Sequence, residues 1–280
     1  MRQFIAEQSL DKKGCLLVEG KKYRYLSSVL RISCGDMIYV RLPDGKLQSM
    51  TVARIDDTKK NIILQSCGDI VSHVQGGEET GNHAEPVKNS TGPQLYLFQF
   101  ISKPPKMDLI IRQAVECGVK GIIPVIGEFC QEGPVESARK KAGLKTKDDR
   151  WNRIITEARE QSGSPVDTKV YECMTVEEAC RFWKKLNAHD TGVALVLYEQ
   201  IEGTMTMHKA LRDTAVTDIA CIAVGAEGGI SPYEIEILKD NDFIPVHFAT
   251  NILRCETAAL YGLAGMQIAL VENKEWQYKE

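Results

Sequence analysis

The chain has 280 residues, of which 43% are hydrophobic and 26% charged, and its formal net charge at pH 7 is −3. This length favours one large domain or two unequal ones, and the near-neutral charge excludes a wholly basic nucleic-acid-binding protein. Because no apolar run reaches the roughly 18 residues of a membrane span and the first residues lack a secretory signal, we expect a soluble, cytoplasmic protein with no membrane partner.

The nine cysteines and five histidines are dispersed along the chain. The cysteines are odd in number and include no CxxC pair, and no two histidines have the HxxxH spacing, so neither a disulfide framework nor a metal site is indicated. We therefore expect reduced cysteines that pack as small apolar residues, and no metal cofactor.

Although the net charge is small, basic and acidic residues are distributed unequally along the chain. Residues 1–70 contain 12 Lys and Arg against 8 Asp and Glu, whereas residues 71–280 contain 23 against 30. A second basic run, over 139–153, has seven cations and two acids. Such runs either contact phosphates or form solvated helix faces, and the sequence leaves both interpretations open.

In chain order, residues 1–71 predict a small all-β domain. Turn signals such as Pro43-Asp44-Gly45 separate its β-like runs, and one helical segment is expected over 23–31. The predicted strands cover 15–18, 37–42, 47–55 and 61–66. Residues 72–93 contain four glycines and two prolines and few large apolar residues, which predicts a linker or long exposed loop.

Residues 94–280 predict a second domain, in which strands alternate with helices. The expected strands cover 94–100, 121–126, 193–199, 218–225 and 243–248. The expected helices cover 106–118 and 150–163, a segment after Ser231-Pro232, and 256–271. This alternation predicts an α/β fold with a mostly parallel sheet that helices cover on both faces. Ligands of such sheets bind at the carboxyl ends of the strands.

The stretch AVGAEGGISPYE lies at one such strand end. Ser231 as N-cap and Glu234 three residues later predict a capping box at the start of a helix. Three glycines precede the cap: Gly225, Gly228 and Gly229. They are explained either by a turn that needs positive φ or by the close approach of a ligand to the backbone. Their spacing matches neither a dinucleotide fingerprint nor a P-loop.

A second candidate segment is HFATNILRCETAALYGLAG, where Arg254 precedes a helix that opens with Glu256-Thr257. This arrangement also fits a surface arginine and a favourable acid in the first helical turn. A third strand end carries Tyr198 and Glu199, so three loops can converge on one pocket at the same edge of the sheet.

Together these segments resemble a known family. VGAEGGIS followed by NILRCETAAL is similar to the motif pair of the RsmE-type 16S rRNA uridine-N3 methyltransferases, in the SPOUT superfamily. KPPKMDLIIRQAVECGVKGIIPV, RWNRIITEAREQSG and YRYLSSVLRISCGDMI resemble further segments of that family, in the same order along nearly the whole chain. The chain departs from the family pattern at Ala226, Cys255 and Ser164, and GEFCQEG lacks an arginine that is common after the second strand.

The resemblance implies a fold, a cofactor and partners. The fold is a SPOUT-type α/β domain with a C-terminal trefoil knot, preceded by a small PUA-like β-barrel that binds RNA. The cofactor is S-adenosylmethionine, and the activity is methylation of uridine N3 in 16S rRNA as part of ribosome maturation. The partners are 16S rRNA or the small ribosomal subunit and a second copy of the chain, joined through the knotted domain.

Residue roles follow from the chemistry of this activity, in which the N3 proton of the uridine must leave and negative charge develops on the uracil oxygens. Arg254 would stabilise negative charge on the uracil, Glu227 would accept the proton or hold backbone amides, and Glu256 would orient Arg254. The expected cofactor-binding residues are Leu197, Tyr198, Glu199, Val224, Gly225, Glu227, Gly228, Gly229, Asn251, Ile252, Leu253, Thr257 and Ala258. The expected RNA-binding residues are Arg24, Arg31, Arg112, Arg150 and Arg153.

Other functions remain open from the sequence. A related SPOUT methyltransferase with another RNA target would use the same cofactor pocket, and a non-catalytic RNA-binding protein of ribosome assembly would use none. A Rossmann-type small-molecule methyltransferase is disfavoured, because no GxGxG motif follows the strand predicted over 94–100.

Overall fold

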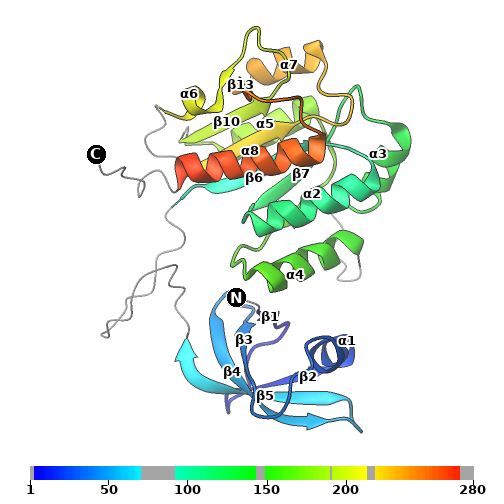
Figure 1. The fold of residues 1–280 in the computed structure, drawn as a ribbon, viewed down its shortest axis with the longest axis vertical. Helices are drawn as coiled ribbons and strands as arrows, with labels where there is room; N and C mark the ends of the chain where they lie inside the picture. The colour runs from blue at the N-terminus through cyan, green and yellow to red at the C-terminus, as the bar shows by residue number, and fades with distance from the viewer. Residues whose placement is uncertain (1–2, 71–91, 143–148, 190, 213–217, 272–280) are drawn as a thin grey trace. The chain divides into compact units, whose positions relative to one another are not determined.

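The computed structural model describes residues 3–70, 92–142, 149–189, 191–212 and 218–271 (Figure 1). The chain divides into two compact units. Unit 1 comprises Met1–Asn89 with Glu160–Gly163, and unit 2 comprises Ser90–Arg159 with Ser164–Glu280. The linker predicted over 72–93 lies outside the described residues except for its last two positions.

Unit 1 is built on a five-stranded sheet with the order β1-β3-β4-β5-β2. The strands are β1 (Phe4–Ile5), β2 (Cys15–Glu19), β3 (Met37–Arg41), β4 (Leu47–Asp56) and β5 (Asn61–Ile70). The pair β1–β3 is parallel, and the other three pairs are antiparallel. Between β2 and β3, a short helix α1 (Gly20–Arg24) continues into a π-helical turn η1 (Tyr25–Val29), where the sequence predicted one helical segment. Leu26 of this turn packs with Val40 and Met50 in the hydrophobic core of unit 1.

Unit 2 contains an eight-stranded sheet in which all the pairs of neighbouring strands are parallel. The order is β11-β13-β10-β12-β6-β7-β8, and β9 also pairs with β7. The strands are β6 (Gln94–Phe100), β7 (Gly121–Ile126), β8 (Lys169–Val170), β9 (Met174–Thr175), β10 (Gly192–Leu197), β11 (Met205–Thr206), β12 (Ile219–Val224) and β13 (Phe243–His247). The central strand β12 is buried along its whole length, as expected of a parallel strand covered on both faces.

Helices cover both faces of this sheet. The helices that follow β6 in the chain are α2 (Pro104–Glu116), α3 (Glu132–Arg139), α4 (Arg150–Ser162), α5 (Val176–Leu186), α6 (Met207–Leu211), α7 (Pro232–Lys239) and α8 (Cys255–Leu270). Successive strand residues point to opposite faces, so Leu97 packs with the core under α2, α6 and α8, and Phe98 with the core under α5 and α7. Figure 1 shows α2 and α8, which are in contact, side by side on the first face.

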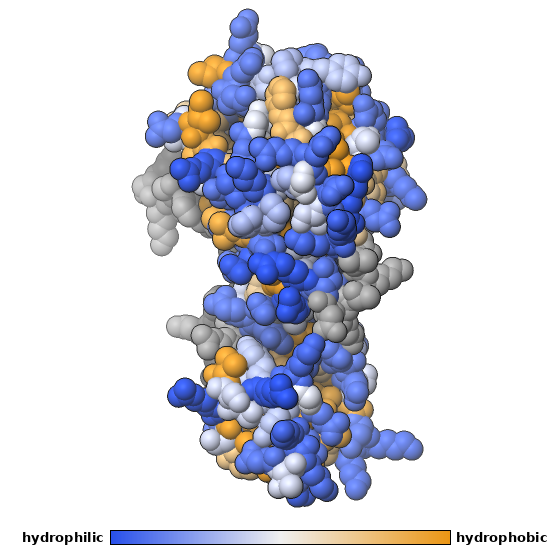
Figure 2. All heavy atoms as spheres, turned by 90° about the vertical axis from the view of Figure 1, so that its right-hand side faces the viewer, coloured by the Kyte–Doolittle hydropathy of each residue, from blue (hydrophilic) through white to orange (hydrophobic). Residues whose placement is uncertain are grey.

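These elements confirm the predicted α/β fold with a mostly parallel sheet. The predicted apolar stripe of α2 is buried in the structure, as shown by Met107, Ile110 and Ile111. Within the described part of the chain, no helix is both long and apolar enough to cross a lipid bilayer. On the face shown in Figure 2, hydrophilic residues cover most of the surface, and hydrophobic residues lie in small groups between them.

Candidate functional site

A cavity of about 610 Å³ lies at the carboxyl edge of the unit 2 sheet, where β10, β12 and β13 end. Because β10 pairs with β12 on one side and with β13 on the other, the loops that follow these strands begin next to one another. The volume lies within the range of small-molecule sites, which is roughly 300–1,000 Å³. The structure thus brings the three segments around Tyr198, Gly225 and Leu253 together at one site.

Most residues expected to bind the cofactor line this cavity. They are Leu197, Tyr198, Glu199, Val224, Gly225, Glu227, Gly228, Gly229, Asn251, Ile252, Leu253 and Ala258. The exception is Thr257, which is exposed on α8 and does not belong to the lining. Two of the three expected catalytic residues, Arg254 and Glu227, also line the cavity, and Glu256 contacts the lining residue Lys106.

The glycine-rich turn after β12 folds tightly on itself. Gly229 has a φ of 79°, and its amide donates a hydrogen bond to the Ala226 carbonyl over 3.0 Å. A Cβ on Gly225 would lie 2.9 Å from the carbonyl carbon of Gly229, and one on Gly228 would lie 2.8 Å from the Cβ of Phe129. Positive φ therefore explains Gly229, while close packing around the turn explains Gly225 and Gly228.

Helix α7 begins directly after this turn with the predicted capping box. The Ser231 hydroxyl accepts a hydrogen bond from the Glu234 amide over 3.3 Å, and the Glu234 carboxylate accepts one from the Ser231 amide over 2.9 Å. The other oxygen of Glu234 accepts a hydrogen bond from the Glu128 amide over 2.7 Å. The cap thus joins the turn to the loop that follows β7.

A buried glutamine on β6 holds the end of β12. The side-chain amide of Gln99 donates hydrogen bonds to the carbonyls of Val224 (3.3 Å) and Gly225 (3.2 Å). Because Gln99 is fully buried, these bonds form in a dry environment and fix the point where the strand turns into the glycine-rich segment.

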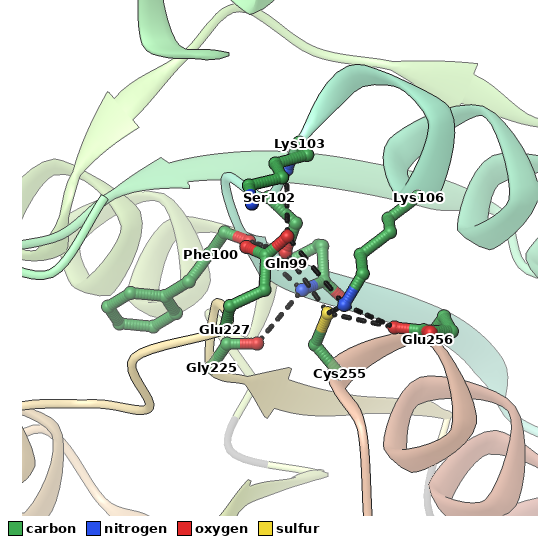
Figure 3. Close-up of polar contacts among 9 residues, drawn as sticks. All are labelled: Gln99, Phe100, Ser102, Lys103, Lys106, Gly225, Glu227, Cys255 and Glu256. Atoms are coloured by element: carbon green, nitrogen blue, oxygen red, sulfur yellow. Dashed lines mark hydrogen bonds and ion pairs between the residues drawn. The ribbon is translucent and has the colours of Figure 1, made fainter. Parts of the chain in front are cut away.

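Lys106 lies at the centre of a polar cluster beside the cavity (Figure 3). Its Nζ is 3.0 Å from Oε2 of Glu256, 3.7 Å from Oε1 of Glu227 and 3.8 Å from Sγ of Cys255. The cluster joins the first turn of α2, the glycine-rich turn and the start of α8, which are far apart in the sequence. The sequence did not single out Lys106, although a cation in the first turn of a helix is an unusual placement.

The charges in this cluster support one another. Burial lowers the pKa of Lys106, but the hydrogen bond with Glu256 and the nearby negative groups raise that pKa by more. Burial raises the pKa of Glu256, but hydrogen bonds from its own amide, Lys106 and Cys255 lower it by more. Burial raises the pKa of the Cys255 thiol, which donates a hydrogen bond to Oε2 of Glu256 over 3.2 Å. At neutral pH the pair therefore consists of an ammonium and a carboxylate.

Arg254 differs from Lys106. It is the N-cap residue of α8, it is exposed, and the described residues provide it with no ion pair or side-chain hydrogen bond. The predicted orientation of Arg254 by Glu256 is therefore not present, because Glu256 pairs with Lys106 instead. The guanidinium is left available at the cavity.

The residues expected to bind RNA do not line the cavity. Arg24 and Arg31 are exposed in unit 1, and Arg112 and Arg153 are exposed in unit 2. Arg150 forms an ion pair with Asp108, with 2.6 Å between Nε and Oδ2. Arg31 has a φ of 53°, an uncommon conformation for a residue other than glycine.

The described residues contain no group of three or more side chains placed to hold a metal ion, and all nine cysteines are free thiols. Residues of the lining that the sequence did not single out include Ile201, Val246, His247, Phe248 and Thr250. Val246 and His247 end strand β13, and the other three lie in loops at the same edge of the sheet. No local pattern in the sequence distinguishes these five residues.

Comparison with known proteins gives a consistent result. The family model for an RNA methyltransferase domain matches residues 89–267. The chain is 25% identical over 263 residues to Ribosomal RNA small subunit methyltransferase E of Bacillus subtilis, covering 94% of this chain and 93% of that protein. It is also 25% identical over 284 residues to Ribosomal RNA small subunit methyltransferase E 2 of Borreliella burgdorferi, covering 98% and 99% of the two chains.

Solved structures show the same fold. A Ribosomal RNA small subunit methyltransferase E from Neisseria gonorrhoeae, bound to S-adenosyl methionine, superposes with a TM-score of 0.73 at 24% identity, covering 96% of this chain and 98% of that one. A probable rRNA-methyltransferase from Porphyromonas gingivalis superposes with a TM-score of 0.69 at 18% identity, covering 98% and 100%.

Proposed function

The chain belongs to the RNA methyltransferase family, and from this premise we propose that it transfers a methyl group from S-adenosylmethionine to N3 of a uridine in 16S rRNA. The observation that carries the proposal is the single cavity where the ends of β10, β12 and β13 meet, which holds Arg254 and Glu227 beside a glycine-rich turn. The names of the similar proteins, which are small-subunit rRNA methyltransferases, support the choice of RNA.

The residues of the cavity fit the cofactor. A Cβ on Gly229 would lie 3.3 Å from the Glu199 carboxylate, so the absence of a side chain keeps this part of the cavity open. The backbone of the turn and of Ile252 and Leu253 can hold the adenine and ribose, because small residues let a ligand approach the main chain closely. The bound cofactor supplies an activated methyl group on a sulfonium.

The chain's own residues have separate tasks. Uridine N3 carries a proton on the Watson–Crick edge, so the base must be unpaired when it enters the cavity. Loss of that proton leaves negative charge on the uracil, and Arg254, with no ion pair to a described residue, is suited to stabilise it. Glu227 accepts the proton or holds the turn, and the walls exclude water and orient the base.

Mass spectrometry of ribosomal RNA tests the function. RNA from cells that lack the chain should miss one 3-methyluridine, and adding the purified protein with S-adenosylmethionine should restore it. Restoration of a different modified nucleoside would identify another RNA methyltransferase. No modification, together with no cofactor binding by calorimetry, would leave the non-catalytic RNA-binding role and contradict the proposal.

We also propose the finer features that the resemblance implies. The path of the chain after β13 supports a knotted C-terminal segment. Strand β13 lies beside β10, whereas the next helix, α8, packs on β12 and β6, so the chain passes across β10 between the two elements. Knots are rare in proteins.

A homodimer is supported by exposed apolar residues on α8, such as Tyr261 and Ile268, and analytical ultracentrifugation tests it. Unit 1 serves as the PUA-like RNA-binding domain, and the free cysteines are consistent with a cytoplasmic location.

A further inference from the structure

Lys106 occupies a position that is unfavourable for a cation. It lies in the first turn of α2, a helix of 13 residues with no acidic residue in that turn. The amino end of a helix carries partial positive charge, so a lysine there is repelled unless other groups compensate. In the structure the compensation comes from Glu256 and Glu227, which belong to other segments. A local conflict that distant residues offset is typical of a functional position.

The two carboxylates are held differently. Oε2 of Glu256 accepts hydrogen bonds from both Lys106 and the Cys255 thiol. Glu227 is bound only through Oε1 in the described contacts, by the Lys103 amide over 3.3 Å and by Lys106 at 3.7 Å. Its other oxygen, Oε2, has no hydrogen-bond partner among the described residues. Glu227 also lines the cavity, and Glu256 does not.

Figure 3 shows how this asymmetry arises. The carboxylate of Glu227 lies beside the backbone that leads from β6 into α2, and the ammonium of Lys106 lies between Glu227 and Glu256. Lys106 therefore connects the side chain of Glu227 to the start of α8. The positive charge of Lys106 offsets the repulsion between the two carboxylates that it contacts.

We propose that Lys106 is a positioning residue, which uses Glu256 as its counter-charge and holds Glu227 by Oε1, so that Oε2 of Glu227 accepts the N3 proton of the uridine. This inference rests on the proposed function. In the step, the proton moves from N3 to Oε2, and N3 keeps the electron pair of the broken N–H bond. That pair forms the bond to the methyl carbon, while the electrons of the methyl–sulfur bond remain on sulfur.

Two substitutions at Lys106 distinguish the effect of its positive charge from the effect of its side-chain length. Lys106→Met keeps the side-chain stem and removes the ammonium, and Lys106→Arg keeps a cation. We expect Lys106→Met to lower kcat about 100-fold, as expected for a misplaced reacting group, with the KM for RNA within about threefold of wild type. Lys106→Arg should recover most of the lost turnover.

A double variant tests whether Lys106 acts through Glu227. Glu227→Gln should lower kcat by roughly 10²- to 10⁴-fold, the usual contribution of a general base. If Lys106 only positions Glu227, adding Lys106→Met to Glu227→Gln should cause no further loss, because the effects of residues that act as a unit are not additive. Multiplicative losses in the double variant would overturn the proposal.

Amide hydrogen exchange gives a readout independent of activity. Without its contact to Lys106, the turn over 226–229 should exchange about tenfold faster in Lys106→Met than in wild type, and at the wild-type rate in Lys106→Arg. Lys185→Met is the control, because it removes the same charge from an exposed position on α5 and should change neither exchange nor kcat.

The outcomes distinguish this inference from the proposed function. A wild-type protein that transfers no methyl group to RNA would contradict the function. An active wild type, with Lys106→Met retaining wild-type kcat and wild-type exchange in the turn, would overturn only the role of Lys106. If Lys106→Met does not fold, the kcat and exchange of Lys106→Arg and the kcat of Glu227→Gln still decide the matter.

Discussion

At the scale of single residues, two cations line the cavity in different states. Lys106 is bound by two carboxylates, whereas Arg254 is exposed and forms no ion pair within the described part of the chain. A cation that already has partners is suited to hold protein groups, and one without partners can respond to charge that develops on a substrate. The structure thus assigns Lys106 to holding protein groups and Arg254 to stabilising charge on the substrate, although both residues are cations.

The first prediction concerns Arg254. Arg254→Ala should abolish methyl transfer, because the negative charge on the uracil loses its cation, and should leave stability nearly unchanged, since exposed substitutions usually alter it by no more than about 0.5 kcal/mol. Transfer of radiolabelled methyl groups and thermal unfolding measure the two effects. Full turnover by the variant would remove Arg254 from the catalytic mechanism.

The second prediction concerns Gly225. The methyl group of Gly225→Ala would meet the backbone of Gly229 at 2.9 Å, so we expect a loss of about 1–3 kcal/mol in stability and weaker binding of S-adenosylmethionine. Gly133→Ala is the control, because it adds the same group to an exposed position of α3 with open space around it. It should leave calorimetric binding unchanged, because Gly133 does not belong to the cavity lining. Equal cofactor affinity in the two variants would contradict the role of the turn.

At the scale of secondary-structure elements, two helices of the described part of the chain begin with complete capping boxes. In α7 the box is Ser231 with Glu234, and in α5 it is Thr175 with Glu178. The first was predicted from the sequence because it follows an apolar strand and a glycine-rich turn. The second carries the same local signal, but α5 was not predicted. The two caps differ in their surroundings, since only the α7 box lies next to a turn that lines the cavity.

The third prediction uses this difference. Ser231→Ala and Thr175→Ala should each destabilise the protein by about 1 kcal/mol, the typical cost of losing an N-cap side chain. Only Ser231→Ala should also weaken the binding of S-adenosylmethionine, because it loosens the helix start that holds the turn. Thermal unfolding and calorimetry on both variants provide the comparison. Equal losses of affinity would show that the α7 cap has no special connection to the cavity.

At the scale of the whole molecule, charge is distributed unevenly along the chain. Residues 1–70 have four more basic than acidic residues, while the rest of the chain has seven more acidic than basic ones. A basic segment that precedes a methyltransferase domain supports a division of labour, in which phosphate contacts position the RNA and the cavity performs the chemistry.

The fourth prediction tests this division. The double variant Arg24→Ala/Arg31→Ala should weaken binding of an rRNA fragment and reduce the dependence of log K on log salt by about one unit per arginine. Its affinity for S-adenosylmethionine should equal that of wild type, because both arginines lie outside the cavity lining. Fluorescence anisotropy at several salt concentrations measures RNA binding, and an unchanged salt dependence would exclude phosphate contacts by these residues.

The sequence by itself determined the features that depend on local patterns. Alternating apolar strands and amphipathic helices indicated the α/β fold with a mostly parallel sheet, and the order Ser231, Pro232, Glu234 indicated a helix start. Strand ends that carry glycines and charges indicated the edge where the cavity lies. These signals are local because strand and helix periodicity and capping involve residues a few positions apart.

Only the tertiary structure decided which charged groups meet. Glu256 and Arg254 are two residues apart, but residues at this spacing do not face each other on a helix, and Glu256 instead pairs with Lys106, 150 positions earlier in the chain. The contact depends on how α2 and α8 lie on the sheet, which no local pattern specifies. The same reason explains why Gln99, a buried residue within an apolar strand, was not recognised as the group that holds the end of β12.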